Sequence, residues 1–195
     1  MTTLIIWSTA AIIYGIFWLW YVGLRTKVTP AEADQAMATL MENGVEDAQA
    51  KSLRDFFASD NGKDFVMVNL LDLKAPKAES GKKLAAYSKV FTGELLRKGG
   101  HPVASAGTRV GTIENIACED FDNWDLAVLM RYRSRRDLME MMIFTAGTEH
   151  RTWKLEALEK TIAFPSTGWS IVGGPRVLVP VAVALVAALT QIILG

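Results

Sequence analysis

Four arginines fall within six consecutive residues of the chain: Arg131, Arg133, Arg135 and Arg136. They span the end of a predicted strand and the start of a predicted helix. Guanidinium groups and a helix N-terminus both favour negative charge, so the cluster is a candidate site for an anionic ligand or a lipid headgroup. Nearby acidic residues offer the simpler alternative, in which the arginines form internal ion pairs: Asp125, Asp137 and Glu140.

Three side chains are the candidates for catalysis: Asn69, Arg131 and His150. Asn69 lies among apolar residues in the middle of a predicted strand, where its amide either faces a ligand cavity or bonds to neighbouring backbone. His150 stands between Glu149 and Arg151, and a tuned pKa would make it a general base. On a helix those two neighbours point elsewhere, so a surface histidine is the alternative.

Few other residues in the sequence are candidates for catalysis or metal binding. Tyr87 is expected to be a core aromatic whose hydroxyl reaches the rim, and His101 follows a glycine in a turn, where histidines are usually solvated. The single cysteine, Cys118, excludes an internal disulfide and a cysteine zinc cluster. No phosphate loop, nucleophile elbow or HExxH motif occurs. We therefore expect no metal and no cofactor, and of the two open alternatives we favour a non-catalytic role over an enzymatic one.

Both ends of the sequence are strongly apolar. Leu4 to Leu24 contains no charge and would span ~31 Å as a helix, matching the ~30 Å hydrocarbon core of a bilayer. Aromatic residues crowd its second end, as at a headgroup boundary. A cleaved signal peptide would instead carry basic residues before the apolar run. Val177 to Leu194 is also uncharged and apolar on every face, with Pro180 in its first turn. We expect a membrane helix at each end, and the lipid bilayer as a partner.

The basic residues lie between the two apolar runs. Arg25, Lys27 and Arg176 are the ones close to the membrane ends, so the positive-inside tendency predicts a cytoplasmic central domain with both termini on the outer side of a bacterial inner membrane. The chain as a whole has 21 basic and 21 acidic residues. This balance gives no electrostatic reason to expect nucleic acid as a partner.

The middle of the chain is predicted to hold a helical hairpin followed by an α+β domain. Thr29-Pro30-Ala31-Glu32 is a typical helix start with a capping box, and a turn at 59–62 ends the second helix. Strands are expected at 65–73, 101–116, 124–132 and 161–172, and helices at 83–98 and 135–144 with a further stretch around Trp153; residues 74–82 are expected to be a loop. The order is β-α-β-β-α-β, the ferredoxin-like pattern, which occurs with many functions.

Short motifs in this segment resemble a known family. They are Met67-Val68-Asn69-Leu70-Leu71, Gly99-Gly100, Trp124-Asp125, Arg131-Tyr132 with Ser134-Arg135, and His150-Arg151 before Ala157-Leu158. Together they resemble the family called domain of unknown function 1330, small members of the dimeric α+β barrel superfamily. The resemblance covers roughly 65–172. It implies two ferredoxin-like units that pair their sheets into a barrel, and hence a homodimer, without implying a reaction.

These patterns predict four segments: a transmembrane helix at 1–25, a helical hairpin linker at 26–62, a ferredoxin-like domain at 63–174, and a transmembrane helix at 175–195. Uncharged membrane helices offer no path for an ion or polar substrate, and their small residues suit close helix packing. We therefore expect a non-catalytic accessory or assembly subunit that binds other membrane protein subunits. The alternative is a membrane-tethered enzyme or binding protein for a small apolar molecule in a barrel cavity.

Overall fold

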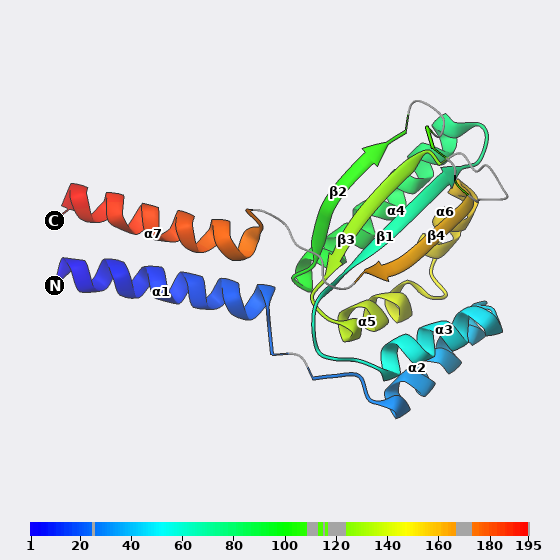
Figure 1. Ribbon diagram of the computed structural model, residues 1–195, viewed down its shortest axis with the longest axis horizontal. Helices are drawn as coiled ribbons and strands as arrows, with labels where there is room; N and C mark the ends of the chain where they lie inside the picture. The colour runs from blue at the N-terminus through cyan, green and yellow to red at the C-terminus, as the bar shows by residue number, and fades with distance from the viewer. Residues whose placement is uncertain (25, 109–112, 115, 117–123, 167–172, 195) are drawn as a thin grey trace. The chain divides into compact units, whose positions relative to one another are not determined.

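The structure is a computed structural model that describes residues 1–24, 26–108, 113–114, 116, 124–166 and 173–194. The chain forms two compact units (Figure 1). One unit joins the two ends, residues 1–24 and 168–195, and the other is the central unit, residues 25–167. Arg25 and Cys118 lie outside the described residues, as do parts of two predicted strands, 109–112 with 115 and 167–172.

The terminal unit is a pair of helices, α1 (Thr2–Tyr21) and α7 (Pro175–Leu194). They run antiparallel, so the two chain ends lie side by side (Figure 1). Both are long and apolar enough to cross a membrane, and both are largely exposed. Helix α7 begins at Pro175, which takes the first helical position, and the Gly174 carbonyl accepts from the Val177 and Leu178 amides. Pro180 therefore lies inside the helix and not in its first turn.

The central unit is built on an antiparallel sheet of four strands within the described residues. The strands are β1 (Phe65–Leu73), β2 (His101–Gly107), β3 (Leu126–Tyr132) and β4 (Leu158–Ser166), in the spatial order β2-β3-β1-β4. The chain order of strands and main helices is the predicted β-α-β-β-α-β order, and every neighbouring pair is antiparallel. The register of β2 against β3 shifts between Pro102 and Ala104, as at a β-bulge.

Three helices of this unit meet the sheet: α4 (Lys77–Arg97), α5 (Arg135–Thr145) and α6 (Glu149–Ala157). Because side chains alternate along a strand, Phe65, Met67, Asn69 and Leu71 point to one face of β1. Phe65 and Met67 pack in the larger apolar cluster, with residues of α4 and α5, while Leu71 packs in the smaller one, with Leu84 and Ala157. The helices thus cover this face of the sheet, and α4 and α6 lie behind it in Figure 1.

The predicted helical hairpin is α2 (Pro30–Glu42) and α3 (Asp47–Ala58). The capping box at its start forms as expected: the Thr29 hydroxyl accepts from the Glu32 amide, and the Glu32 carboxylate accepts from the Thr29 amide. The apolar stripe of α2 and α3 joins the larger apolar cluster, where Phe57 is fully buried. The hairpin therefore packs on the core of the central unit.

Several element boundaries differ from the predicted ones. Strand β2 ends at Gly107 and β3 begins at Leu126, both inside the ranges expected for those strands. Helix α4 begins at Lys77, inside the segment expected to be a loop, because the Pro76 carbonyl caps it by accepting from the Glu79 and Ser80 amides. The polar residues there are good helix formers, and their polarity made the segment resemble a loop. Strand β4 begins at Leu158, three residues before its predicted start, directly after α6 ends.

Candidate functional site

The guanidinium of Arg131 is fully buried and bonded inside the domain. Its Nε donates to Asp64 Oδ2 at 3.0 Å, and its Nη1 donates to the Gly99 carbonyl at 2.7 Å. The side chain has 0% of its surface exposed, against 14% for Asp64. These contacts tie the end of β3 to the segment before β1 and to the turn after α4.

The other three arginines of the sequence cluster also bond to protein groups. Arg133 pairs with Asp137, whose carboxylate accepts from the Ser134 hydroxyl at the start of α5. Arg135 lies over the Phe56 ring, with 4.3 Å from Cζ to the ring centroid, and donates to the Phe56 carbonyl and to Ser59.

Arg136 binds the lead-in to α2. It forms two hydrogen bonds to the Glu32 carboxylate and donates to the carbonyls of Thr26 and Lys27. This pairing lowers the pKa of Glu32 to about 2. The four arginines are neighbours in sequence, but each guanidinium bonds to different groups, which is the arrangement expected for internal ion pairing. An anion at this cluster stays a prediction.

Asn69 projects from the middle of β1 toward the helices. Its Nδ2 donates to the Met67 carbonyl at 3.2 Å and to the Val128 carbonyl at 3.1 Å. Within the described residues its Oδ1 accepts no hydrogen bond, so the amide keeps one acceptor on the helix-facing side. Val128 is its direct neighbour on β3 and contacts both apolar clusters. Asn69 is therefore the polar group at the junction of the two clusters.

Three residues of helix α6 lie at helical spacing on one side of the helix: His150, Lys154 and Ala157. Ala157 is fully buried. The His150 ring meets Trp153 edge-on, with 4.9 Å between ring centroids. Its Nδ1 is buried and has no hydrogen-bond partner among the described residues. A buried imidazole nitrogen without a partner is costly in free energy, and each such group calls for an explanation.

The ammonium group of Lys154 is also without a counterion in the described part of the chain. Its Nζ lies 5.8 Å from the centre of the Tyr87 ring, and it forms no ion pair or hydrogen bond there. Burial, followed by the charge of Arg151, lowers the pKa of Lys154. Both Lys154 and Tyr87 are partly exposed residues.

Tyr87 of α4 supplies the ring beside Lys154. It stacks on Phe91, with 5.4 Å between ring centroids, and packs against the smaller apolar cluster. Burial raises the pKa of the Tyr87 hydroxyl, and the pKa of Tyr132 is raised by burial and by the nearby Tyr87. We call Asn69, Tyr87, His150 and Lys154 the interior polar cluster.

The sequence indicated three members of this cluster and missed Lys154. The sequence predicted a helical stretch around Trp153 without indicating which of its residues face inward; Leu155 is 59% exposed. Lys154 takes the inward position because it lies four residues after His150 and three before Ala157. That helical spacing was the signal in the sequence that could have identified Lys154. Among the described residues, no three His, Cys, Asp or Glu side chains gather as a metal site would require. His101 is partly exposed at the start of β2.

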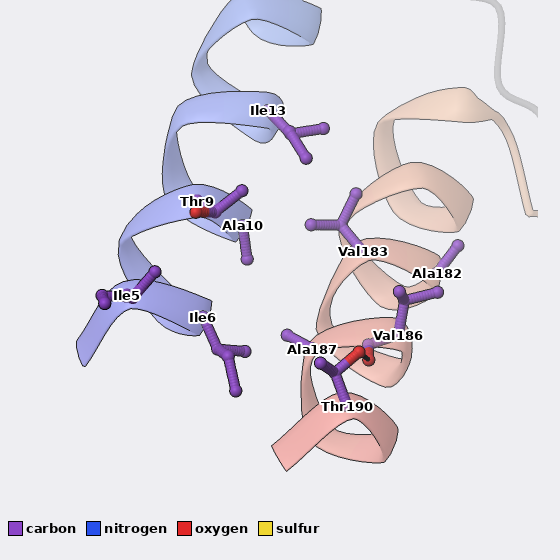
Figure 2. A pocket seen from close by; sticks show the side chains of 10 residues that line it. All are labelled: Ile5, Ile6, Thr9, Ala10, Ile13, Ala182, Val183, Val186, Ala187 and Thr190. Carbon is purple, nitrogen blue, oxygen red and sulfur yellow. Dashed lines mark hydrogen bonds between the residues drawn. The ribbon is translucent and has the colours of Figure 1, made fainter. Parts of the chain in front are cut away.

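The terminal unit contains a second candidate site, a groove of about 390 Å³ between α1 and α7 (Figure 2). Its walls are apolar except for two threonine hydroxyls: Ile5, Ile6, Thr9, Ala10 and Ile13 from α1, and Ala182, Val183, Val186, Ala187 and Thr190 from α7. Trp7 Nε1 donates to Gln191 Oε1 at 2.7 Å and joins the two helices beside the groove. The Thr190 hydroxyl is satisfied by the Val186 carbonyl of its own helix.

Comparisons with known proteins extend the description of the fold. No family model matches the chain, and no curated protein matches it. Two solved structures of RPA0582, a protein of unknown function from Rhodopseudomonas palustris, are similar to it. One aligns with a TM-score of 0.49 and 18% identity over 62% of this chain and 94% of that one. The other, of the methylated protein, aligns with a TM-score of 0.50 and 20% identity over 62% and 91%. At this identity the second likeness concerns the α+β fold alone.

Proposed function

We propose that α1 and α7 anchor the chain in a lipid bilayer and that the central unit lies on the cytoplasmic side. Each helix has 20 residues, a length of ~30 Å that matches the hydrocarbon core. Helix α1 carries no charge, and α7 carries none from Val177 to Leu194. Their large side chains are exposed along most of their length, which in water would be an unusually large apolar surface. Lys27 and Arg176 are basic residues next to the two helices in sequence, and the positive-inside tendency places such residues on the cytoplasmic side.

Reporter fusions test this arrangement in cells. Alkaline phosphatase joined after residue 195 is expected to be active, because that end would lie outside, and a fluorescent protein at the same position is expected to be dark. The reverse result would overturn the orientation. Extraction of the chain from membranes by alkaline carbonate, without detergent, would overturn the anchoring itself.

Within this placement, we propose that the chain is a non-catalytic accessory or assembly subunit of a larger membrane complex. This proposal is based on the exposed apolar faces of α1 and α7. The two helices meet through small residues, since Ala10 and Ala187 are the buried ones on the facing sides. Beside this contact lies the apolar groove of Figure 2. Small residues beside a groove suit the close approach of a further helix.

The test is purification of the tagged chain from native membranes in mild detergent at native expression. A discrete larger complex is expected, and a lone monomer or homodimer would overturn the proposal. Ala182→Trp fills the groove and is expected to release the partner while the chain stays in the membrane. The matched control is Leu185→Trp on the same helix, because Leu185 is 58% exposed and does not line the groove. If both variants keep the partner, the groove is not the contact.

We also propose that the central unit has the dimeric α+β barrel form of the resembled family and pairs with a second copy. The sheet face opposite the helices carries apolar side chains: Val68, Leu70, Leu129, Ile162 and Phe164. Ile162 is 49% exposed and Phe164 47%. Pairing of two such faces would remove this surface from water. Phe164→Lys is expected to separate the copies in analytical ultracentrifugation. An unchanged sedimentation profile would overturn the pairing.

The second candidate function is a membrane-tethered enzyme or binding protein for a small molecule. The unsatisfied groups of the interior polar cluster favour it. Turnover that survives alanine at Asn69, Arg131 and His150 would exclude these three residues as its catalytic groups.

A further inference from the structure

The groove between α1 and α7 contains a hydroxyl group that the helix pair leaves without a hydrogen bond. Helical threonines commonly donate to the carbonyl four residues earlier, and Thr190 does so, with 2.8 Å from its Oγ1 to the Val186 carbonyl oxygen. The Thr9 hydroxyl, on the α1 side of the same groove, forms no hydrogen bond within the described residues. The donor of Thr190 is therefore used inside its own helix, whereas Thr9 has a donor to offer.

The depth of Thr9 makes an unpaired hydroxyl costly. Thr9 lies seven residues after Thr2, the first residue of α1, which is ~10 Å along the helix axis. In the proposed anchoring this point is inside the hydrocarbon layer, where acyl chains offer no hydrogen-bond acceptor. Burial of a hydroxyl without a hydrogen bond costs free energy. Lipid chains alone are therefore a poor occupant for this part of the groove, and an occupant with an acceptor oxygen is favoured.

The neighbours of Thr9 restrict which acceptor can reach it. Ile5 and Ile13 lie one helical turn before and after it on α1 (Figure 2), and they are 58% and 52% exposed. Their side chains are longer than that of threonine, so they hold a further helix towards the long end of the usual spacing of about 8–10 Å between axes. At that spacing a polar side chain of the further helix reaches the hydroxyl more easily than its backbone carbonyls do. The small side chain of Ala182, on the opposite wall, leaves room for it.

We propose that the groove binds a transmembrane helix of the partner subunit that carries an asparagine or a glutamine, whose side-chain carbonyl accepts from the Thr9 hydroxyl. This inference rests on the proposed accessory role and names the feature by which the partner is recognised. A carboxylate at this depth would cost more free energy than an amide, and a serine or threonine hydroxyl of the partner would bond within its own helix. The apolar walls of the groove then pack against the apolar residues on either side of the amide.

The rate at which the partner is released from the purified complex in mild detergent tests the hydrogen bond. Thr9→Val keeps the shape of the side chain and removes the hydroxyl. It is expected to speed release about threefold, because interhelical hydrogen bonds in membranes contribute about 0.6 kcal/mol. Thr9→Ser keeps the hydroxyl and is expected to release the partner more slowly than Thr9→Val does. Thr190→Val is the matched control on the opposite wall and is expected to behave as wild type, because the Thr190 hydroxyl is bonded within α7.

Photo-crosslinking identifies the residue opposite Thr9. A photoreactive amino acid in place of Ile13, on the wall of the groove, is expected to label a transmembrane span of the partner with an asparagine or glutamine within about one helical turn of the labelled residue. Replacement of that amide residue by leucine is expected to add nothing to the effect of Thr9→Val, because the two changes remove the same hydrogen bond.

The outcomes separate this inference from the accessory role. Equal release rates for wild type and Thr9→Val would overturn the inference, as would an equal acceleration by Thr190→Val or a labelled span without an asparagine or glutamine. In each of these cases the partner still co-purifies, and the accessory role stands. A wild-type chain that purifies without any partner would overturn the accessory role and the inference with it.

Discussion

The substitution Asp64→Ala tests whether Arg131 is a structural residue or one free to bind a ligand. It removes the carboxylate that accepts from Arg131 Nε at 3.0 Å and leaves the fully buried guanidinium in place. A buried charge that loses its counterion costs about 3–5 kcal/mol. Since Asp64 is 14% exposed, water can reach the vacated position, and we expect the lower end, a loss of about 3 kcal/mol in the free energy of unfolding.

The comparison variant is Arg131→Met, which removes the charge and keeps much of the side-chain volume. It leaves the Gly99 carbonyl without its guanidinium donor, at a cost of about 1–3 kcal/mol. Asp64 can then turn to solvent and needs no counterion. Arg131→Met is therefore expected to cost about 1–2 kcal/mol, less than Asp64→Ala. The test is which variant loses more free energy of unfolding, because an arginine that only binds a ligand would not need the Asp64 carboxylate.

Thermal unfolding of the full chain in mild detergent, followed by near-ultraviolet circular dichroism, measures both variants. A loss of about 3 kcal/mol corresponds to a fall in Tm of about 6–12 °C for a domain of this size. The reasoning is refuted if Asp64→Ala melts like wild type while Arg131→Met is strongly destabilised. That result would mean that the guanidinium does not need the Asp64 carboxylate.

Three further predictions concern other contacts. Gly100→Ala would place a Cβ 2.6 Å from the Arg131 carbonyl oxygen, and we expect a loss of about 1–3 kcal/mol by the same unfolding assay. Because Arg136 lowers the pKa of Glu32 to about 2, the stability from this pair is present above pH 4.5 and lost as the pH falls from there towards 2. Glu32→Gln is expected to abolish that acid-dependent loss, as measured by unfolding at stepped pH. Gln191→Leu removes the indole hydrogen bond across α1 and α7, and is expected to weaken their pairing by about 0.6 kcal/mol, measured by crosslinking of cysteines placed in the two helices.

Local patterns in the sequence predicted most of the fold. The capping box at Thr29 is encoded within four residues, and the nearly continuous apolar run of β1 identifies a buried strand without knowledge of its neighbours. The start of α4 was not recognised, because its first turns are polar and the carbonyl of Pro76 caps it in place of a side chain. Such a boundary has no capping residue type in the sequence.

The candidate site was harder to predict, because its contacts depend on register and on helix rotation. Asn69 was visible as a polar residue in an apolar strand, but its partner Val128 is fixed only by the pairing of β1 with β3. Lys154 and Leu155 are neighbours in α6, and the sequence did not single out Lys154. Only the packing of α6 against α4 decides which of these two neighbours faces inward, and that contact joins residues far apart in sequence.

The four arginines and the interior polar cluster show why proximity in sequence is a poor guide to a site. Arg131 lies in β3, Arg133 between the strand and the helix, and Arg135 in the first turn of α5, and each meets a separate partner. Tyr87 and Lys154 come from different helices, yet their contact leaves a cation without a counterion among the described residues. A ligand site needs polar side chains whose hydrogen bonds or charges are not already satisfied by the protein itself. The arginines are bonded to protein groups, so their closeness in sequence is not by itself evidence for a ligand site.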